Sequence, residues 1–275
     1  MSHFHRLRSP SSWRRLSLHT WQPPHDPTVY GTLEVDAQNA LDFLAERSEQ
    51  SGLKITITHL VGKAVAEAIA ARPDVNAVVR RGRHIYQRES VDIFFQVAFD
   101  GGEDLSGAKI SNVDRKSVEE IARELAERAA RVRAHADREL TPQRELLSRI
   151  PAFLRGPAMH AAEFLSYDLG LNLSRLGLPF DAFGSAMVTN VGMFGLPSGF
   201  APLVPFSRAP IVITVGTIEP RPRAVEGEVK VRPVLPIGAT LDHRLLDGFQ
   251  VGQLTRRFRE VLEDPVATLG SPASG

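Results

Sequence analysis

The sequence predicts an α/β protein in which helices and strands form a sandwich. Two observations carry this prediction. Segments in which apolar and polar residues alternate, as they do in strands, are interleaved along the chain with segments whose apolar residues recur at helical spacing. The chain has 275 residues, of which 43% are hydrophobic and 24% charged, which is the composition of a globular protein with a substantial core.

The first part of the chain predicts a strand followed by two helices. Residues 29–35 are apolar at every second position, which indicates a strand, and Asp36 can cap the helix that follows. Thr58 can cap the next helix, which Pro73 ends. The residues expected to face the core from these two helices are Leu41, Leu44, Ala45, Val61, Val65, Ala68 and Ile69.

A second strand and a long helix are predicted next. Residues 91–99 alternate cleanly, so this strand has one strongly apolar face. Ser117 and Glu120 have the spacing of a capping box and begin a helix expected to run to about Leu140. Its predicted inward residues are Ile121, Leu125, Ala129 and Val132.

The last third predicts two strands and a helix. Residues 211–216 form an apolar strand, residues 219–227 are rich in turn formers, and residues 229–241 alternate and then remain mostly apolar, as a strand does. A helix follows until Asp264-Pro265 stops it. Its inward residues are Val251, Leu254, Phe258, Val261 and Leu262.

The junction between that strand and helix carries the sequence Asp242-His243-Arg244-Leu245-Leu246-Asp247-Gly248. The unperturbed pKa of histidine lies nearest neutrality, so His243 could take a proton from an alcohol or thiol and return it later. The pattern therefore indicates acyl-transfer chemistry. Two structural alternatives remain, because His243 could be a hydrogen-bonded structural histidine and Asp247 could form a capping box with Gln250.

A second motif lies upstream, where a short apolar strand and Thr189-Asn190 stand between Gly184 and Gly192. Ordinary turn chemistry at a strand end is its structural alternative. The two motifs in this order resemble the catalytic domain of the 2-oxo acid dehydrogenase acyltransferases, the dihydrolipoamide acyltransferase family of the chloramphenicol acetyltransferase-like superfamily. Further similarity lies in Arg14-Arg15-Leu16, in Leu33-Glu34-Val35-Asp36 and in residues 56–76.

The resemblance implies a chloramphenicol acetyltransferase-like two-layer sandwich with a large mixed sheet, assembled as a trimer with active sites between subunits. It implies a coenzyme A-dependent acyltransferase without a metal, in which His243 is the general base and Thr189 stabilises the oxyanion, with Asn190 as the neighbouring alternative. Asp247 would order the motif turn. An ion pair between Asp247 and Arg14 or Arg15 is a further expectation.

Two regions depart from the family pattern. Residues 99–107 read Phe-Asp-Gly-Gly-Glu-Asp-Leu-Ser-Gly, in a region that helps to form the family's channel for coenzyme A and acceptor. An added helical segment is expected at about 146–179, with an apolar stripe of Leu147, Ile150, Phe153 and Leu154. Contact with the protein's own subunits is the favoured interpretation of this stripe, ahead of a lid over the channel and of a helix on a membrane surface.

The expected organisation is a disordered basic N-terminus at 1–13, a catalytic domain at 14–265 and a flexible tail at 266–275. Because about thirteen residues precede the similar region, the resemblance implies a free-standing domain without a lipoyl domain of its own. A lipoyl group supplied in trans and a small thiol or hydroxyl acceptor both remain open. A non-catalytic scaffold or regulatory homologue is the alternative function; the altered 99–107 region favours it and the intact motifs oppose it.

Composition excludes several classes of function. The formal net charge is +1, so no nucleic-acid partner is expected. The chain has no cysteine, which excludes disulfides, cysteine-ligated metals and a cysteine acyl-enzyme. No segment has the apolar length of a membrane span, and we expect a cytoplasmic homotrimer or multiple of trimers. The basic first dozen residues fit a frayed terminus better than an organelle transit peptide.

Overall fold

The computed structural model describes residues 11–12, 26–81, 84–99, 104–133, 150–173 and 180–270. The strands are β1 (Thr28–Asp36), β2 (Ala77–Arg80), β3 (His84–Gln87), β4 (Ile93–Phe99), β5 (Asp104–Ile110), β6 (Ala186–Asn190), β7 (Ile211–Val215), β8 (Glu219–Val225) and β9 (Glu228–Asp242). The helices are α2 (Gln38–Ser51), α3 (Ile57–Ala71), α4 (Val118–Arg133), α6 (Ala152–Glu163), α7 (Gly248–Glu263) and α8 (Pro265–Leu269).

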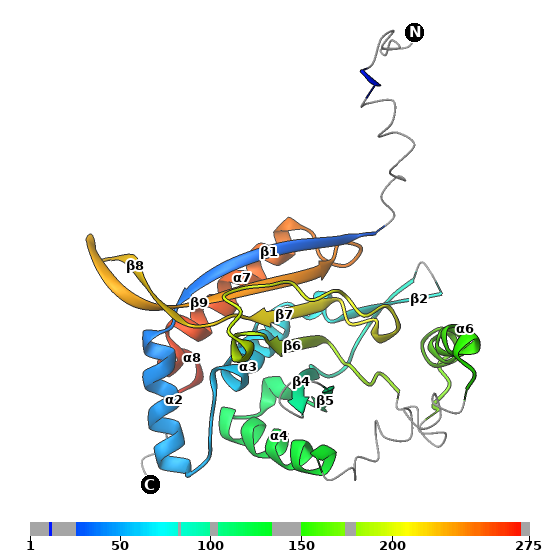
Figure 1. Ribbon diagram of the computed structural model, residues 1–275, viewed down its shortest axis with the longest axis horizontal. Helices are drawn as coiled ribbons and strands as arrows, with labels where there is room; N and C mark the ends of the chain where they lie inside the picture. The colour runs from blue at the N-terminus through cyan, green and yellow to red at the C-terminus, as the bar shows by residue number, and fades with distance from the viewer. Residues whose placement is uncertain are drawn as a thin grey trace.

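Seven strands form one mixed sheet in the order β1-β9-β7-β6-β4-β5, and β8 also pairs with β9 (Figure 1). Strand β6 lies parallel to both β4 and β7, whereas the other pairs are antiparallel. Strands β2 and β3 form a separate antiparallel pair. The α/β fold with a mixed sheet is therefore confirmed.

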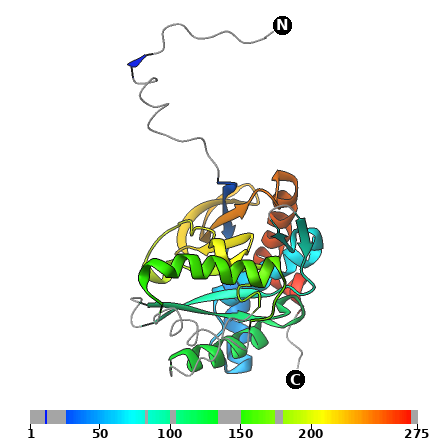
Figure 2. The same cartoon turned by 90° about the vertical axis from the view of Figure 1, so that its right-hand side faces the viewer.

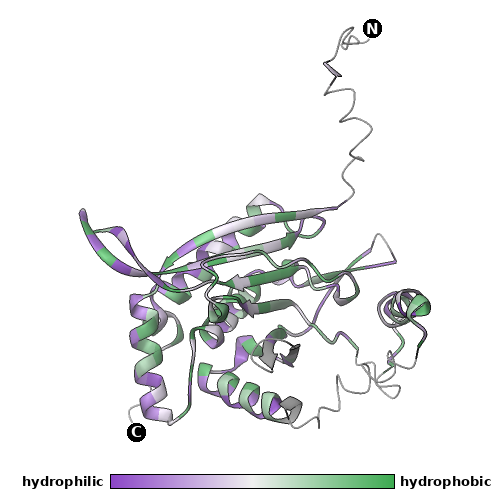
Figure 3. Cartoon of the chain, viewed as in Figure 1, coloured by the Kyte–Doolittle hydropathy of each residue, from purple (hydrophilic) through white to green (hydrophobic). Residues whose placement is uncertain are grey.

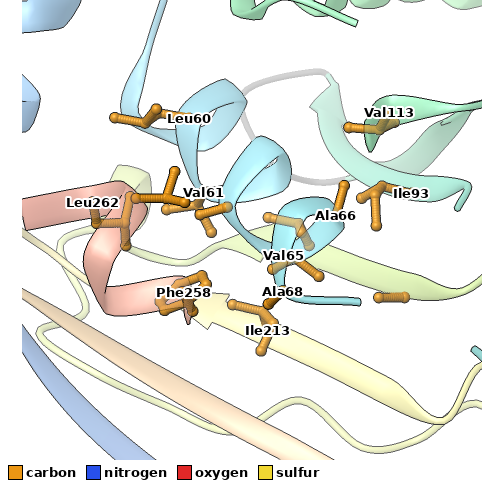
Figure 4. Packing of buried hydrophobic residues seen from close by; sticks show 14 of the residues in the cluster. Leu60, Val61, Val65, Ala66, Ala68, Ile93, Val113, Ile213, Phe258 and Leu262 are labelled. Atoms are coloured by element: carbon orange, nitrogen blue, oxygen red, sulfur yellow. The ribbon is translucent and has the colours of Figure 1, made fainter. Parts of the chain in front are cut away.

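The hydrophobic core lies between this sheet and a layer of helices. Inward residues of β4, β6, β7 and β9 join α2, α3, α4 and α7 in one buried cluster. Figure 4 shows part of it, where Val61 of α3 lies beside Leu262 and Phe258 of α7. On the other face of the sheet, Met187 and Val212 form a smaller buried cluster with residues of the loop that follows β6. Most of the buried apolar surface thus belongs to the helix side.

Two helix starts differ in detail from the sequence prediction. Helix α2 has Ala37 as N-cap, although Asp36 still accepts a hydrogen bond from the Gln38 N–H at 3.0 Å. Its core-facing residues are Ala40, Phe43 and Leu44, while the predicted Leu41 and Ala45 are exposed. The prediction for Leu44 is confirmed, whereas those for Leu41 and Ala45 are wrong, because alanine and leucine occur on both faces of this helix.

Helix α3 is capped by Thr56 and not by the predicted Thr58. Thr56 has an extended backbone, its side chain accepts from the His59 backbone, and its own N–H donates to Nδ1 of His59 at 3.0 Å. Thr58 already lies inside the helix. The predicted inward residues Val61, Val65, Ala68 and Ile69 are buried, as expected.

The buried imidazole of His59 makes stability depend on pH. Burial lowers the pKa of His59 from 6.5 to about 4, so the unfolded chain binds this proton between those values and the folded chain does not. The contribution of the neutral His59 to the free energy of unfolding is then fully present above pH 6.5 and is lost as the pH falls toward 4. The loss is on the order of 3 kcal/mol.

Urea unfolding of the wild type and of His59→Gln at a series of pH values checks this. Glutamine at this position keeps the capping box, because its side chain can also accept from the Thr56 N–H. We expect the loss of stability between pH 6.5 and 4 to be smaller in His59→Gln. Equal losses in the two proteins would contradict the assigned cause.

Strand β8 is a correction, because residues 219–227 were expected to be turn-rich. Residues 219–225 instead pair with β9, with Pro220 opposite Pro233 and Pro222 opposite Val231. Two prolines that face each other cannot exchange N–H···O bonds, so the nitrogens of Pro220 and Pro222 point away from β9, where a missing N–H breaks no bond of the ladder. The hairpin projects from the body of the protein and alternates between polar and apolar residues (Figures 1 and 3).

Part of the added segment forms α6, which lies on the outside of the protein (Figure 2), and the single π-helical turn η4 (Phe164–Asp168). Arg208 holds both elements. Its Nε contacts Oε1 of Glu163 at 2.7 Å and its Nη2 contacts Oδ2 of Asp168 at 2.6 Å. The Tyr167 hydroxyl donates to the Ser207 carbonyl at 2.8 Å. The segment is therefore attached through polar contacts.

Two residues of the apolar stripe of this segment are largely exposed in the described part of the chain, whereas Ile150 is half-buried. Phe153 is 78% exposed and Leu154 44%, whereas Leu147 lies outside the described residues. The expected contact of the stripe with the protein's own subunits stays a prediction, as do its alternatives, a lid over the channel and a helix on a membrane surface. Among the helices that the structure describes, none has both the length and the hydrophobicity needed to cross a bilayer.

Candidate active site

His243 lies in a tight turn between β9 and α7. Its backbone N–H donates to the Pro27 carbonyl at 2.9 Å, and the N–H groups of Leu245 and Leu246 both donate to the Asp242 carbonyl. The side chain of Leu246 is fully buried and anchors the turn in the core, while His243 itself is exposed. The turn is thus fixed by its backbone and by one leucine, which leaves the imidazole available to a substrate.

Asp242 and Arg244 form a two-pronged ion pair beside His243. Nε of Arg244 lies 2.9 Å from Oδ1 of Asp242, and Nη2 lies 2.6 Å from Oδ2. The hydrogen bonds to Asp242 raise the pKa of Arg244. Both residues line a pocket of about 470 Å³, whose wall also contains Arg208 and Glu163. The added segment therefore reaches the pocket next to the motif.

Asp247 is the N-cap of α7. Its carboxylate accepts from the backbone N–H groups of Phe249 and Gln250, and the Gln250 side chain accepts from the Asp247 N–H at 2.9 Å. The capping box is therefore present. Arg14 and Arg15, the expected ion partners of Asp247, lie outside the described residues. Arg72 is a cation that the sequence analysis missed: its pKa is raised chiefly by Asp74, with a smaller attraction from Asp247.

We expect Asp247→Ala to lower the free energy of unfolding by about 1 kcal/mol, because the first turn of α7 loses its cap. It should also lower the rate of any reaction that uses His243, because the same carboxylate fixes the turn that carries His243. Urea unfolding and a rate assay measure both effects. Asp264→Ala is the matched control, since Asp264 caps α8 through the Ala267 N–H; it should lose stability alone. Equal rate losses in the two variants would refute the role in the turn.

Thr189 and Asn190 lie at the C-terminal end of β6. The Asn190 side chain donates to Oγ1 of Thr58 at 2.8 Å and accepts from the Met193 N–H at 3.2 Å. It thereby ties the end of β6 to the start of α3. A Cβ on Gly192 would lie 2.5 Å from the Gly216 carbonyl oxygen, so only glycine fits where these two backbone segments come together. Thr189 is half-buried and faces the side of the sheet away from the helices, as Met187 does.

The structure does not bring Thr189 and His243 together within one chain. Thr189 is opposite Thr214 of β7, whereas Leu241, two residues before His243, is opposite Ile211. His243 is therefore five residue steps away along the strands, roughly 16 Å, and two strands away across the sheet, about 10 Å. The two residues lie at opposite ends of these strands. A hydroxyl that stabilises an oxyanion must lie within about 3 Å of it, so Thr189 is too far away to serve an oxyanion that forms beside His243 of the same chain.

Two further hydroxyl groups near Thr189 were missed. Thr58 accepts a hydrogen bond from Asn190, and Thr214 is the cross-strand neighbour of Thr189. Thr214 is fully buried, and among the residues that the structure describes its Oγ1 has no hydrogen-bond partner. Thr214 could have been noticed in the sequence, because it is a polar residue in the middle of the apolar run of β7. Within the described ranges, no three histidine, aspartate or glutamate side chains gather as metal ligands would.

A sequence profile of the 2-oxoacid dehydrogenases acyltransferase catalytic domain matches residues 20–143 and 182–269, which together are well over half of the chain. The chain belongs to this family. The stretch that the 2-oxoacid dehydrogenase acyltransferase profile leaves unmatched, residues 144–181, includes α6 and η4.

The relatives agree with this assignment to the 2-oxoacid dehydrogenase acyltransferases. The chain is 26% identical over 228 residues to component 5 of the chloroplastic pyruvate dehydrogenase complex of Arabidopsis thaliana, a dihydrolipoyllysine-residue acetyltransferase; the match covers 82% of the chain and 39% of that protein. The chain thus spans about two fifths of this relative's length.

Two solved structures share the fold. A probable dihydrolipoamide acetyltransferase of Listeria monocytogenes has a TM-score of 0.65 and 19% identity, with 98% of each chain covered. The dihydrolipoamide acetyltransferase of Azotobacter vinelandii, crystallised to examine a serine, a histidine and an asparagine in its mechanism, has a TM-score of 0.65 and 23% identity, with 89% of this chain and 85% of that chain covered.

Proposed function

We propose that the protein is a coenzyme A-dependent acyltransferase that moves an acyl group between coenzyme A and a thiol, such as a dihydrolipoyl group, or a hydroxyl acceptor. One observation carries the proposal: a member of this family presents an exposed histidine on a turn fixed by the backbone, by Leu246 and by the Asp247 cap. The histidine and serine examined in the Azotobacter relative support an imidazole and a hydroxyl as the working groups.

His243 acts first, as general base. Its neutral imidazole removes the proton from the acceptor thiol or hydroxyl, whose sulfur or oxygen then attacks the thioester carbonyl carbon. The Thr189 hydroxyl, with the Asn190 amide as the alternative, donates a hydrogen bond to the carbonyl oxygen as it becomes negative. When the bond from carbon to the coenzyme A sulfur breaks, the imidazolium returns its proton to the leaving thiolate. No metal takes part in these steps.

The distance between His243 and Thr189 within one chain supports a site shared between two subunits. Each active site takes His243 from one chain and Thr189 from its neighbour, and a trimer is the assembly that we propose. The exposed face of α6 provides apolar surface for such contacts. Light scattering at micromolar concentration should give a trimer or a multiple of trimers, and a monomer mass would rule out the shared site.

Calorimetry with coenzyme A, followed by an assay of acyl transfer from acetyl-coenzyme A to dihydrolipoamide, tests the function. We expect heat of binding and turnover in the wild-type protein. A scaffold homologue that has lost its substrate channel gives neither, so the absence of both across a panel of acyl donors would replace the enzyme by the scaffold.

A further inference from the structure

An apolar pocket of about 180 Å³ lies between the sheet and the helices and is partly open to solvent, with exposed Thr32 and half-buried Gly31 at its mouth. Its floor is formed by β1, β7 and β9 and its roof by α3 and α7. Figure 4 shows four residues of its wall, Val65 and Ala68 of α3, Phe258 of α7 and Ile213 of β7, gathered between the two layers. Protein interiors have few voids larger than a water molecule, so a space of this size needs a cause.

Gly31 is that cause. Along β1 the residues that pack toward the helices are Val29, Leu33 and Val35, and Gly31 occupies the same alternating position without a side chain. A Cβ built on Gly31 would meet no atom within 4 Å. Glycine weakens a strand interior and often marks a place where another group approaches closely. Because Gly31 has no side chain, the space between β1 and α7 at this position stays unfilled.

The lining decides which occupant fits. Thr32 and Thr255 supply the only side-chain hydroxyls among the wall residues, and no wall residue is charged. A buried water needs two to four polar partners, and a charged ligand would lose its hydration without compensation. A space of about 150 Å³ is large enough to hold a benzene molecule. We infer that this cavity is a binding site for an uncharged hydrocarbon group of roughly six carbon atoms, such as a short alkyl chain.

The cavity lies directly behind the His243 turn. Leu241, the last core residue of β9 before the turn, belongs to its wall, and so do Val251 and Leu254 in the first turns of α7. A hydrocarbon in the cavity therefore contacts the two elements that hold the turn from either side. The binding site itself does not depend on the proposed acyltransferase activity, and its test needs no turnover.

Benzene is the probe, and thermal unfolding of the full chain is the readout. The melting temperature of the wild type should rise with benzene concentration, because the ligand binds the folded state alone. Gly31→Val fills the cavity from β1 and should remove this rise. Gly252→Ala is the matched control: it also adds a side chain where nothing lies within 4 Å, on α7 but outside the cavity wall, and should keep the full rise.

A second measurement locates the ligand. Benzene should shift the methyl NMR signals of Ile213 and Leu241 in the wild type, and Ala68→Val, which fills the space from α3, should suppress these shifts even if Gly31→Val fails to fold. A wild type with neither a rise in melting temperature nor methyl shifts overturns the site. So does a rise that persists in folded Gly31→Val and Ala68→Val, because benzene would then bind elsewhere.

Discussion

His243→Ala should lower the turnover number for acyl transfer roughly a hundred- to ten-thousandfold while the protein stays folded. The rate is lost because alanine cannot accept the acceptor's proton. The fold is kept because the His243 hydrogen bond to Pro27 comes from the backbone N–H and the imidazole is exposed. Steady-state kinetics with acetyl-coenzyme A and dihydrolipoamide measure the loss, and thermal unfolding verifies the fold.

His84→Ala is the matched control, because His84 is exposed on β3, a strand outside the seven-stranded sheet that carries the motif. It should keep the wild-type rate. Full activity in purified His243→Ala would remove the general base from the mechanism.

Thr189→Val should lower turnover about a hundredfold or more, because valine keeps the shape of threonine and deletes the hydroxyl that donates to the oxyanion. The shared site adds a sharper expectation. When His243→Ala and Thr189→Val chains are co-assembled in equal amounts, sites that combine an intact His243 with an intact Thr189 from the next chain reappear. Activity should return to about one quarter of the wild-type value, as random pairing in a closed ring requires.

Thr240→Val is the control for the hydroxyl deletion. Thr240 is fully buried on β9 and its hydroxyl has no hydrogen-bond partner, so valine removes the same group from the same sheet without touching β6. Its rate should match the wild type. If mixing the two inactive chains restores nothing while each alone still assembles, His243 and Thr189 do not form a site between neighbouring chains.

Local signals in the sequence predicted most elements. The capping boxes at Ser117 and at Asp247 both form, because each depends only on residues three positions apart. The cap of α3 was misplaced, since two threonines precede that helix and only the contact between Thr56 and His59 distinguishes them. Strand β8 was missed because its prolines look like turn formers until the pairing with β9 shows where their nitrogens point.

The sequence could suggest which residues form the candidate site, but it could not predict how those residues are arranged in space. The motifs predict His243 and Thr189 as candidates, and their roles stay predictions. The register of β6, β7 and β9 decides how far apart they lie, and register depends on contacts between distant segments. The link from Asn190 to Thr58 spans 132 residues and leaves no local pattern. The Gly31 cavity likewise exists only once β1 is placed against α7.

The prolines of β8 also decide how the projecting hairpin behaves in a concentrated solution. A long exposed strand edge normally offers a row of free N–H groups that recruits strands from other molecules, which is how ordered aggregates grow. Here the outer edge of β8 lacks two of those donors, at Pro220 and Pro222, while Val229 and Val231 of the same hairpin are 80% and 73% exposed. The hairpin can therefore offer side chains to a partner while resisting fibrillar stacking along β8.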